Sequence, residues 1–463
     1  MADALWTSAD IAAATGGQAV GAPFEATGVS IDSRAVDPGD LFVALTGERD
    51  GHAFTPGARA AGAAGVLASK PVDGPHVLVP DTLKALEALG VAARDRSLAL
   101  RAAVTGSVGK TSVTQAIAAG LAGAGRWHSS VKSYNNHIGV PLTLARMPWA
   151  TERAVFEIGM NHADEISPLS RMVRPEVAVV TTVGPVHIEN FPDGEAGVAR
   201  AKAEIFDGIE PDGVAVLNAD NRWFDMLAQH ARAAGARVLS FGSGEGCDAR
   251  LVDFTAAHGA ASVRAVIHGE ALSYPLLQTG VHWGLNSLCA LLALEAMRVD
   301  RSVALEALAG FAPLAGRGAE KTVRIAGGAF TLIDESYNAN PISMVAAFKT
   351  LGARQARGRR IVVLTDMLEL GPDAPAFHAG LAAPIEAANV DLAFCAGPMM
   401  KSLWDALPPT RRGGYAEAAA DLAPRIAAAV EPGDLVMVKG SNGSRASAIA
   451  AALAALDVTG ETA

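Results

Sequence analysis

Short apolar runs bounded by Gly, Pro, Asn and Asp recur along the whole chain. From residue 98 to residue 314 these runs alternate with stretches whose apolar spacing fits a helix. Such alternation is typical of a mostly parallel sheet covered by helices. The strands predicted in this central part are residues 98–104, 154–158, 177–182, 213–217 and 237–241, and residues 113–121 fit a helix directly after the first strand.

The same α/β pattern precedes and follows the central part. The predicted strands are residues 28–31, 40–45, 65–68 and 76–79 before it, and residues 329–333, 360–364, 392–395 and 434–438 after it. The alanine-rich residues 446–456 fit a helix. At 463 residues the chain is too long for one core, because a domain holds roughly 100–200 residues. We therefore predict three α/β domains: a small one at residues 1–96, a central parallel-sheet domain at 97–314 and a Rossmann-like domain at 315–463.

Polar clusters follow several of the predicted strands. In the central part they are residues 157–161, 181–187 and 218–220, and in the last part they are residues 334–341, Asp366 and residues 439–442. Parallel sheets bind ligands where the carboxyl ends of their strands meet, so the clusters predict a site on each of two domains. We expect the polar clusters of the two domains to face each other across a cleft. Such a cleft can close on a substrate and exclude water.

Residues 104–112 read Val-Thr-Gly-Ser-Val-Gly-Lys-Thr-Ser and join the first central strand to its helix. Glycines allow a tight turn close to an anion, Lys110 supplies a positive charge, and the Thr111 hydroxyl can hold Mg²⁺. The full phosphate-loop pattern has a further glycine where this chain has Val104. An ordinary turn is the alternative, but the strand and helix on either side favour a phosphate loop with ATP as its ligand.

Composition argues against several other classes of protein. The formal charge of −10 disfavours general nucleic-acid binding, which needs a basic face. No run of about 18 uncharged apolar residues predicts a membrane span, and the first residues lack the order of a signal peptide. Cys247, Cys289 and Cys395 are too scattered for a disulfide framework or a zinc site, so we expect buried thiols in a cytoplasmic protein.

Two longer motifs lie in the last domain. Residues 334–341 read Asp-Glu-Ser-Tyr-Asn-Ala-Asn-Pro, and residues 366–371 read Asp-Met-Leu-Glu-Leu-Gly. With the phosphate loop they resemble the Mur ligases of bacterial peptidoglycan synthesis, and the resemblance covers nearly the whole chain. Both motifs are similar to the branch that joins D-alanyl-D-alanine to UDP-N-acetylmuramoyl-tripeptide with ATP. The resemblance implies these substrates, and we expect a monomer that works in the cytoplasm and binds neither nucleic acid nor membrane.

The resemblance also implies which residues hold ATP and magnesium. Lys202 matches a lysine that becomes carbamylated, since CO₂ on its neutral amine creates a carboxylate-like ligand. By position alone, Lys202 would be a solvated helix lysine and His187 a plain polar residue at a strand end. The implied catalytic residues are Lys110, His187 and Lys202; the ligands of two Mg²⁺ ions are Thr111, Glu157, His187 and Lys202; the ATP-binding residues are Gly106, Ser107, Gly109, Lys110, Thr111, Ser112, His282, Asn286, Arg317 and Glu335.

Substrate contacts are implied in all three domains. The residues are Ser33, Arg34, Asn136, Asn161, Ser336, Tyr337, Asn338 and Asn340. Turn formation is the alternative for Ser33 and Arg34, and helix capping is the alternative for the two central asparagines. Glu335 departs from the aspartate common in this branch, and Asn-Gly-Ser stands before Arg445, where we would expect an arginine sooner. No ligand for the dipeptide carboxylate is assigned there.

Three other functions compete with this interpretation. A ligase adding one diamino acid shares the domain plan, but the chain lacks the Asp-Asn-Pro-Arg-like segment that we associate with it. A folate polyglutamate synthase would lack the extra amino-terminal domain. A nucleotide-dependent switch or transport ATPase would need only the phosphate loop. Phosphate release measured with each substrate alone and with both discriminates such a protein from a ligase, because only a ligase requires both.

Overall fold

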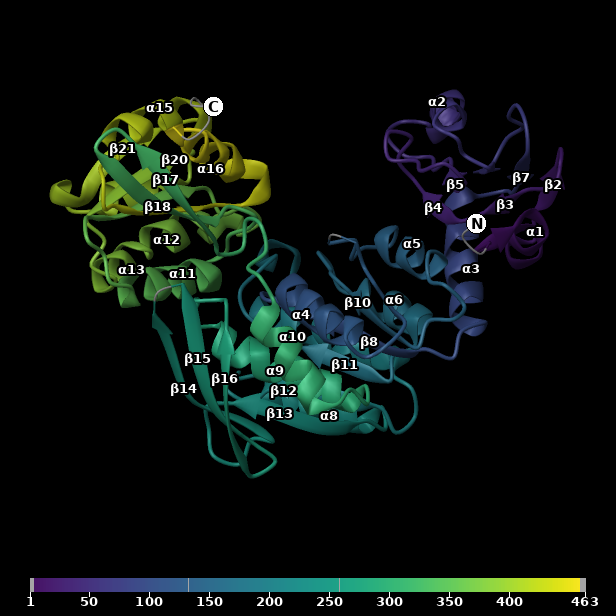
Figure 1. Ribbon diagram of the computed structural model, residues 1–463, viewed down its shortest axis with the longest axis horizontal. Helices are drawn as coiled ribbons and strands as arrows, with labels where there is room; N and C mark the ends of the chain where they lie inside the picture. Colours follow the sequence, from purple (N-terminus) through teal and green to yellow (C-terminus); the bar gives the residue numbers. More distant parts are fainter. Residues whose placement is uncertain (1–3, 132, 258, 459–463) are drawn as a thin grey trace.

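The computed structural model describes residues 4–131, 133–257 and 259–458, and these form three α/β units, each built on its own main sheet (Figure 1). The units follow one another along the chain, and the central one lies between the other two in the view of Figure 1. Within the described residues, no helix is long and apolar enough to span a membrane.

The first unit is a five-stranded sheet in the order β2-β7-β6-β5-β4. Neighbours from β4 to β7 are parallel, and β2 is antiparallel at the edge. The long helix α3 packs against α5 of the central unit and leads into that unit's sheet. The strands are β2 (Gln18–Val20), β4 (Gly28–Ser30), β5 (Asp40–Val43), β6 (Gly65–Ala68) and β7 (His76–Leu78), and the helices are α1 (Ser8–Thr15), α2 (Thr55–Ala60) and α3 (Thr82–Asp95); β1 (Trp6–Thr7) and β3 (Glu25–Ala26) form a separate pair.

The central unit contains a nine-stranded sheet in the order β16-β15-β14-β13-β12-β11-β8-β10-β9. The strands from β9 to β14 in this order are parallel neighbours, as the sequence pattern predicts for this part of the chain. The three strands at the other edge form an antiparallel ribbon that the sequence analysis missed. The strands are β8 (Leu100–Thr105), β9 (Trp127–Ser129), β10 (Arg153–Glu157), β11 (Val177–Val180), β12 (Val214–Asn218), β13 (Arg237–Gly242), β14 (Ala249–Ala257), β15 (Ala260–Ile267) and β16 (Glu270–Leu276).

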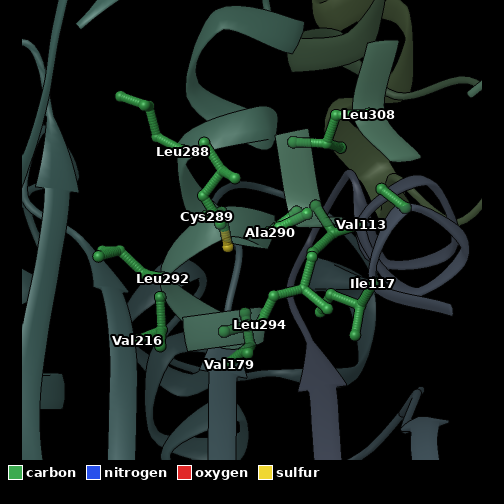
Figure 2. Close-up of a cluster of buried hydrophobic side chains, with 14 of the residues drawn as sticks. Val113, Ile117, Val179, Val216, Leu288, Cys289, Ala290, Leu292, Leu294 and Leu308 are labelled. Atoms are coloured by element: carbon green, nitrogen blue, oxygen red, sulfur yellow. The ribbon is translucent and has the colours of Figure 1, made fainter. Parts of the chain in front are cut away.

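Helices cover both faces of this sheet, and each face has its own apolar core. On one face, Val113 and Ile117 of α4 pack with Leu288 and Leu292 of α9 over the sheet (Figure 2). This packing fixes α4, so the loop before it has a defined position. The helices are α4 (Lys110–Ala122), α9 (Trp283–Ala296) and α10 (Arg301–Gly310) on that face, and α5 (Gly139–Ala145), α6 (Ile166–Val173), α7 (Glu195–Ala203) and α8 (Phe224–Ala233) on the other.

The third unit is a doubly wound sheet in the order β17-β18-β22-β19-β20-β21, parallel except for β17 at one edge. Apolar cores lie on both faces. The strands are β17 (Ala319–Ile325), β18 (Gly328–Glu335), β19 (Arg360–Thr365), β20 (Leu392–Ala396), β21 (Arg412–Ala416) and β22 (Leu435–Lys439); the helices are α11 (Pro341–Ala353), α12 (Ala374–Ala379), α13 (Ala382–Ala387), α14 (Met400–Ala406), α15 (Ala419–Ala429) and α16 (Ala446–Ala454).

Two details of the sequence analysis were wrong. Leu98 is 99% exposed and lies before β8, although the apolar run suggested that the strand begins there. Of the three cysteines, Cys289 and Cys395 are buried free thiols, but Cys247 is only partly buried. The predicted strand start at Leu98 and the predicted burial of Cys247 were both wrong for the same reason. Local sequence does not show which neighbours cover a side chain.

Candidate functional site

The glycine loop lies between the end of β8 and the start of α4. Gly106 and Gly109 have φ values of +149° and +85°, which side chains rarely adopt, and a Cβ at Gly106 would collide with the Thr181 hydroxyl. Thr181 also donates a hydrogen bond to the Val108 carbonyl at 2.6 Å. The Thr181 side chain, directly after β11, therefore supports the loop just before α4.

Ser107 joins this loop to the segment after β11. Its hydroxyl donates to the Gly184 carbonyl at 3.0 Å and accepts from the Gly184 N–H at 2.9 Å. Lys110 folds back and donates to the Gly106 carbonyl at 2.7 Å. The predicted phosphate loop is thus a pre-shaped turn at the carboxyl edge of the sheet, in the position where such sheets bind ligands.

Lys110, Glu157 and Lys202 meet beside the loop. Lys202 and Glu157 are each only 1% exposed, so the alternative of a solvated Lys202 does not hold. Burial lowers the pKa of Lys202 well below its ordinary value, and the nearby Lys110 adds to the effect. Burial also lowers the pKa of Lys110, against the attraction of Glu157. Burial therefore shifts Lys202 towards the neutral amine.

One carboxylate oxygen of Glu157 is buried without a hydrogen-bond partner in the parts of the chain that the structure describes. Its Oε1 accepts a hydrogen bond from Asn135 at 2.7 Å, whereas its buried Oε2 has no hydrogen-bond partner among the described residues. An unpaired buried carboxylate oxygen is costly, and a hard cation would satisfy it. The described residues contain no group of three His, Cys, Asp or Glu side chains placed to hold a metal ion. A cation here fits only if ligands such as phosphate oxygens, Thr111 or a modified Lys202 complete its shell.

Side chains of the third unit reach this site. Arg317 donates to the Thr111 hydroxyl at 3.0 Å, and its guanidinium carbon lies 4.2 Å from the centre of the Tyr337 ring. Tyr337 in turn donates to Ser133 at 3.1 Å, and Ser133 lies 3.0 Å from the Thr111 hydroxyl. Arg317 and Tyr337 are separated from Thr111 by about half the chain, yet all belong to one cluster. Ser133 is a member that the sequence analysis missed.

A second contact between the units joins His187 to Glu369. His187 Nδ1 lies 2.6 Å from Glu369 Oε2. The pairing with His187 lowers the pKa of Glu369. The sequence analysis implied a role for His187 but none for Glu369, because the motif of Glu369 was used only to identify the family.

His282 and Asn286 lie where the central and third units meet. His282 is the residue before α9, and Asn286 approaches the loop, since a Cβ on Gly109 would lie 3.4 Å from its Oδ1. A narrow pocket is lined by His282, Trp283, Arg317 and Glu335 from the two units. Burial lowers the pKa of His282 and favours its neutral form. The structure thus brings His282, Arg317 and Glu335 to one pocket, and Arg317 links this pocket to the loop through Thr111.

Several predicted substrate residues are engaged in local structure. Asn136 Oδ1 accepts from the N–H groups of Ile138 and Gly139 at 3.2 and 2.9 Å, as the capping alternative expected. Asn340 caps α11 through Ser343. Asn161 is exposed, and its carbonyl accepts a hydrogen bond from Asn190 at 3.1 Å.

The remaining polar residues of the third unit form their own network. Lys439 is 3% exposed, lies 3.3 Å from Glu335 and donates to the Asn338 carbonyl at 3.1 Å. Ser336 donates to Asp334 at 2.5 Å. Of this motif, Tyr337 donates a side-chain hydrogen bond to the central unit.

Ser33 and Arg34 are not brought to the glycine loop. They lie in the turn after β4, where Arg34 is paired with Asp32 at 2.8 Å and is 85% exposed. The described interactions of Arg34 stay within that turn. The turn alternative explains the observed geometry, and any role in binding depends on a ligand that spans from the first unit to the central one.

Comparison with known proteins agrees with this three-part architecture. Residues 25–107 match the Mur ligase family catalytic domain, residues 104–294 the Mur ligase middle domain, and residues 321–442 the Mur ligase glutamate ligase domain. The chain is 36% identical over 391 residues to the UDP-N-acetylmuramoyl-tripeptide--D-alanyl-D-alanine ligase of Escherichia coli, covering 82% of this chain and 83% of that protein. It is 33% identical to the Bacillus subtilis ligase of the same name, covering 90% and 91%.

Solved structures show the same fold. A crystal structure of MurF from Acinetobacter baumannii superposes with a TM-score of 0.85 and 26% identity, and the match covers 97% of this chain and 99% of that one. The similarity therefore extends through all three units and their arrangement. The chain belongs to the Mur ligase family.

Proposed function

We propose that the protein is an ATP-dependent amide-bond ligase that joins D-alanyl-D-alanine to UDP-N-acetylmuramoyl-tripeptide. The observation that carries the proposal is the split site: Arg317 and Tyr337 of the third unit contact the Thr111 and Ser133 hydroxyls beside the glycine loop of the central unit. A transfer between two anionic partners needs this kind of site, in which separate units bring the reactants together. The curated relatives that carry the same reaction in their names support the choice of substrates.

In the proposed reaction, the terminal carboxylate of the tripeptide attacks the γ-phosphate of ATP, forming an acyl phosphate and ADP. The amine of the dipeptide then attacks the acyl carbon, the tetrahedral intermediate collapses, and phosphate leaves as the amide forms. The loop N–H groups and Lys110 would stabilise the charge on the phosphates. Arg317 would add a positive charge from the third unit.

Magnesium is part of the proposal because the unpaired Oε2 of Glu157 suits a cation whose shell phosphate oxygens, Thr111 or a modified Lys202 would complete. Thr111, Glu157, His187 and Lys202 would hold two ions, which neutralise phosphate charge when bound. The orphaned Oε2 of Glu157 and the buried amine of Lys202 support these roles. A neutral amine is the form that reacts with CO₂, so the lowered pKa of Lys202 favours carbamylation.

We assign nucleotide-sugar binding to residues 1–96, including Ser33 and Arg34, ATP binding to residues 97–314 and dipeptide binding to residues 315–463. The pocket at His282 and Glu335 would receive the nucleoside part of ATP. Asn136, Asn161, Ser336, Asn338 and Asn340 remain proposed substrate contacts. Three free cysteines suit a reducing compartment, so we place the reaction in the cytoplasm. We also propose that the protein acts as a monomer.

Phosphate release tests the function directly. The protein is incubated with ATP and Mg²⁺ plus the tripeptide substrate, plus D-alanyl-D-alanine, or plus both, and the product mass is then measured. Strong release that requires both substrates, with a product of the summed mass less water, supports the ligase. Release that is indifferent to either substrate would identify an ATPase or switch and refute the proposal.

A further inference from the structure

Glu369 of the third unit faces His187 of the central unit across the interface between them. The closest atoms are Glu369 Oε2 and His187 Nδ1, 2.6 Å apart. This is an ion-pair distance, although the angles are not those of a hydrogen bond. Because Nδ1 faces the carboxylate, the opposite ring nitrogen, Nε2, is turned away from Glu369.

Both residues have left-handed backbone conformations. The φ value is +54° at His187 and +63° at Glu369, in a region that costs a residue with a side chain about 1 kcal/mol or more. Such conformations persist only where the surroundings impose them. Two of them at one contact indicate that the positions of both side chains are strongly constrained.

The loop that carries Glu369 is anchored on both sides. The Met367 N–H donates to Nε2 of the buried His378 at 3.0 Å, and the Leu368 N–H donates to the Ser441 hydroxyl at 3.0 Å. Met367 and Leu370 are 1% and 2% exposed and pack in the core of the third unit. Glu369 is therefore presented by a fixed loop, although its own side chain is half exposed.

The segment that carries His187 is held by the third unit at two further points. A Cβ on Gly184 would collide with Ile342 of α11, and a Cβ on Gly371 would lie 3.1 Å from the Glu189 Cβ. At its other side, Gly184 exchanges two hydrogen bonds with Ser107 of the glycine loop. The segment 184–189 thus links the docking of the third unit to the phosphate loop.

We propose that Glu369 is a positioning residue that prepares His187 to bind a divalent cation, so that this site is complete only when the third unit docks. The proposal rests on the proposed ligase function, which makes His187 a metal ligand. A carboxylate that accepts the Nδ1 proton of a histidine fixes the tautomer with its lone pair on Nε2 and makes that nitrogen a better ligand. The 2.6 Å contact places Glu369 Oε2, from another unit of the chain, to take this role once the Nδ1–H turns towards it, and this would couple metal binding to domain docking.

The test uses the full chain, Mn²⁺ as the probe and two readouts that need no turnover. Manganese binding is followed by electron paramagnetic resonance, and the His187 tautomer by ¹⁵N chemical shifts, assigned with His187→Asn. We expect Glu369→Ala to weaken Mn²⁺ binding at the His187 site about 10- to 100-fold and to reduce the Nδ1–H tautomer. Glu369→Gln keeps an accepting oxygen and should fall between Glu369→Ala and the native chain.

Asp373→Asn is the matched control, since it removes one negative charge from an exposed residue near the same loop. Within the described part of the chain, Asp373 forms no ion pair with His187. It should bind Mn²⁺ as the native chain does, and circular dichroism should show that all variants are folded. Unchanged or tighter Mn²⁺ binding in Glu369→Ala, or an unchanged tautomer, would overturn the proposal. A native chain that fails the two-substrate assay would instead refute the ligase function, so the two failures are distinguishable.

Discussion

Acidification should destabilise the central unit through His128 of β9. Its Nε2 lies 2.7 Å from the Thr143 carbonyl, and its ring is 6.3 Å from that of Phe156. Burial lowers the pKa of His128 from 6.5 to about 4, with the hydrogen bond to Thr143 opposing the shift. Between pH 6.5 and about pH 4, His128 is therefore mostly neutral in the folded state and mostly protonated in the unfolded chain.

The sign and size of the effect follow from this difference. Because the folded pKa is the lower one, the stabilisation is fully present above pH 6.5 and is lost as the pH falls towards 4. Between pH 7.5 and pH 5.0 the loss of unfolding free energy attributable to His128 is up to about 2 kcal/mol, and the full loss at lower pH is about 3 kcal/mol.

Urea denaturation at the two pH values measures this loss in the native chain and in His128→Gln, whose amide can still donate to Thr143 but does not titrate. The variant also carries every other titrating group, so the difference between the two chains isolates His128. We expect the native chain to lose up to about 2 kcal/mol more than the variant on going to pH 5.0. Parallel losses in both chains would refute the reasoning.

Three further predictions concern the site. Lys202→Ala should lower ligase turnover about 100-fold or more, with partial recovery in acetate or formate, which can replace a carbamate; full activity that ignores carboxylates would show that Lys202 is a bystander. Arg317→Ala should reduce kcat about 100-fold while the circular dichroism spectrum stays native, because a charge beside Thr111 is lost; an unchanged kcat would contradict its role. Gly106→Ala should abolish nucleotide binding and cost about 1–3 kcal/mol of stability, because of the left-handed φ and the Thr181 hydroxyl; calorimetry with ATP that finds native affinity would argue against the loop as the cradle.

Much of the α/β architecture was predictable because parallel strands are buried on both faces and read as short apolar runs. The runs at residues 177–182 and 360–364 correspond to β11 and β19, with boundaries that differ by one or two residues. The ribbon β14–β16 was missed although β15 alternates exposed and buried residues. Its inward positions include Ala261 and Ala265, which are too small and too common in helices to mark a strand.

The sequence predicted many of the residues that line the site, but it did not predict which of them contact one another. Lys110 and Thr111 could be found because the chemistry of a phosphate loop is local in sequence. The partners Ser133 and Glu369 could not, since each acts through a residue far away along the chain. The burial that lowers the pKa of Lys202 is likewise a property of packing, which a helical Ala-Lys-Ala segment does not reveal.

The contacts described between the central and third units are mainly polar, and this bears on product release. Arg317 with Thr111, Tyr337 with Ser133 and Glu369 with His187 are each pairs whose partners water can replace. Each such pair contributes on the order of 1 kcal/mol, so separating the units is inexpensive compared with unfolding either one. The interface is suited to open once per catalytic cycle, and the rate of that opening can limit turnover.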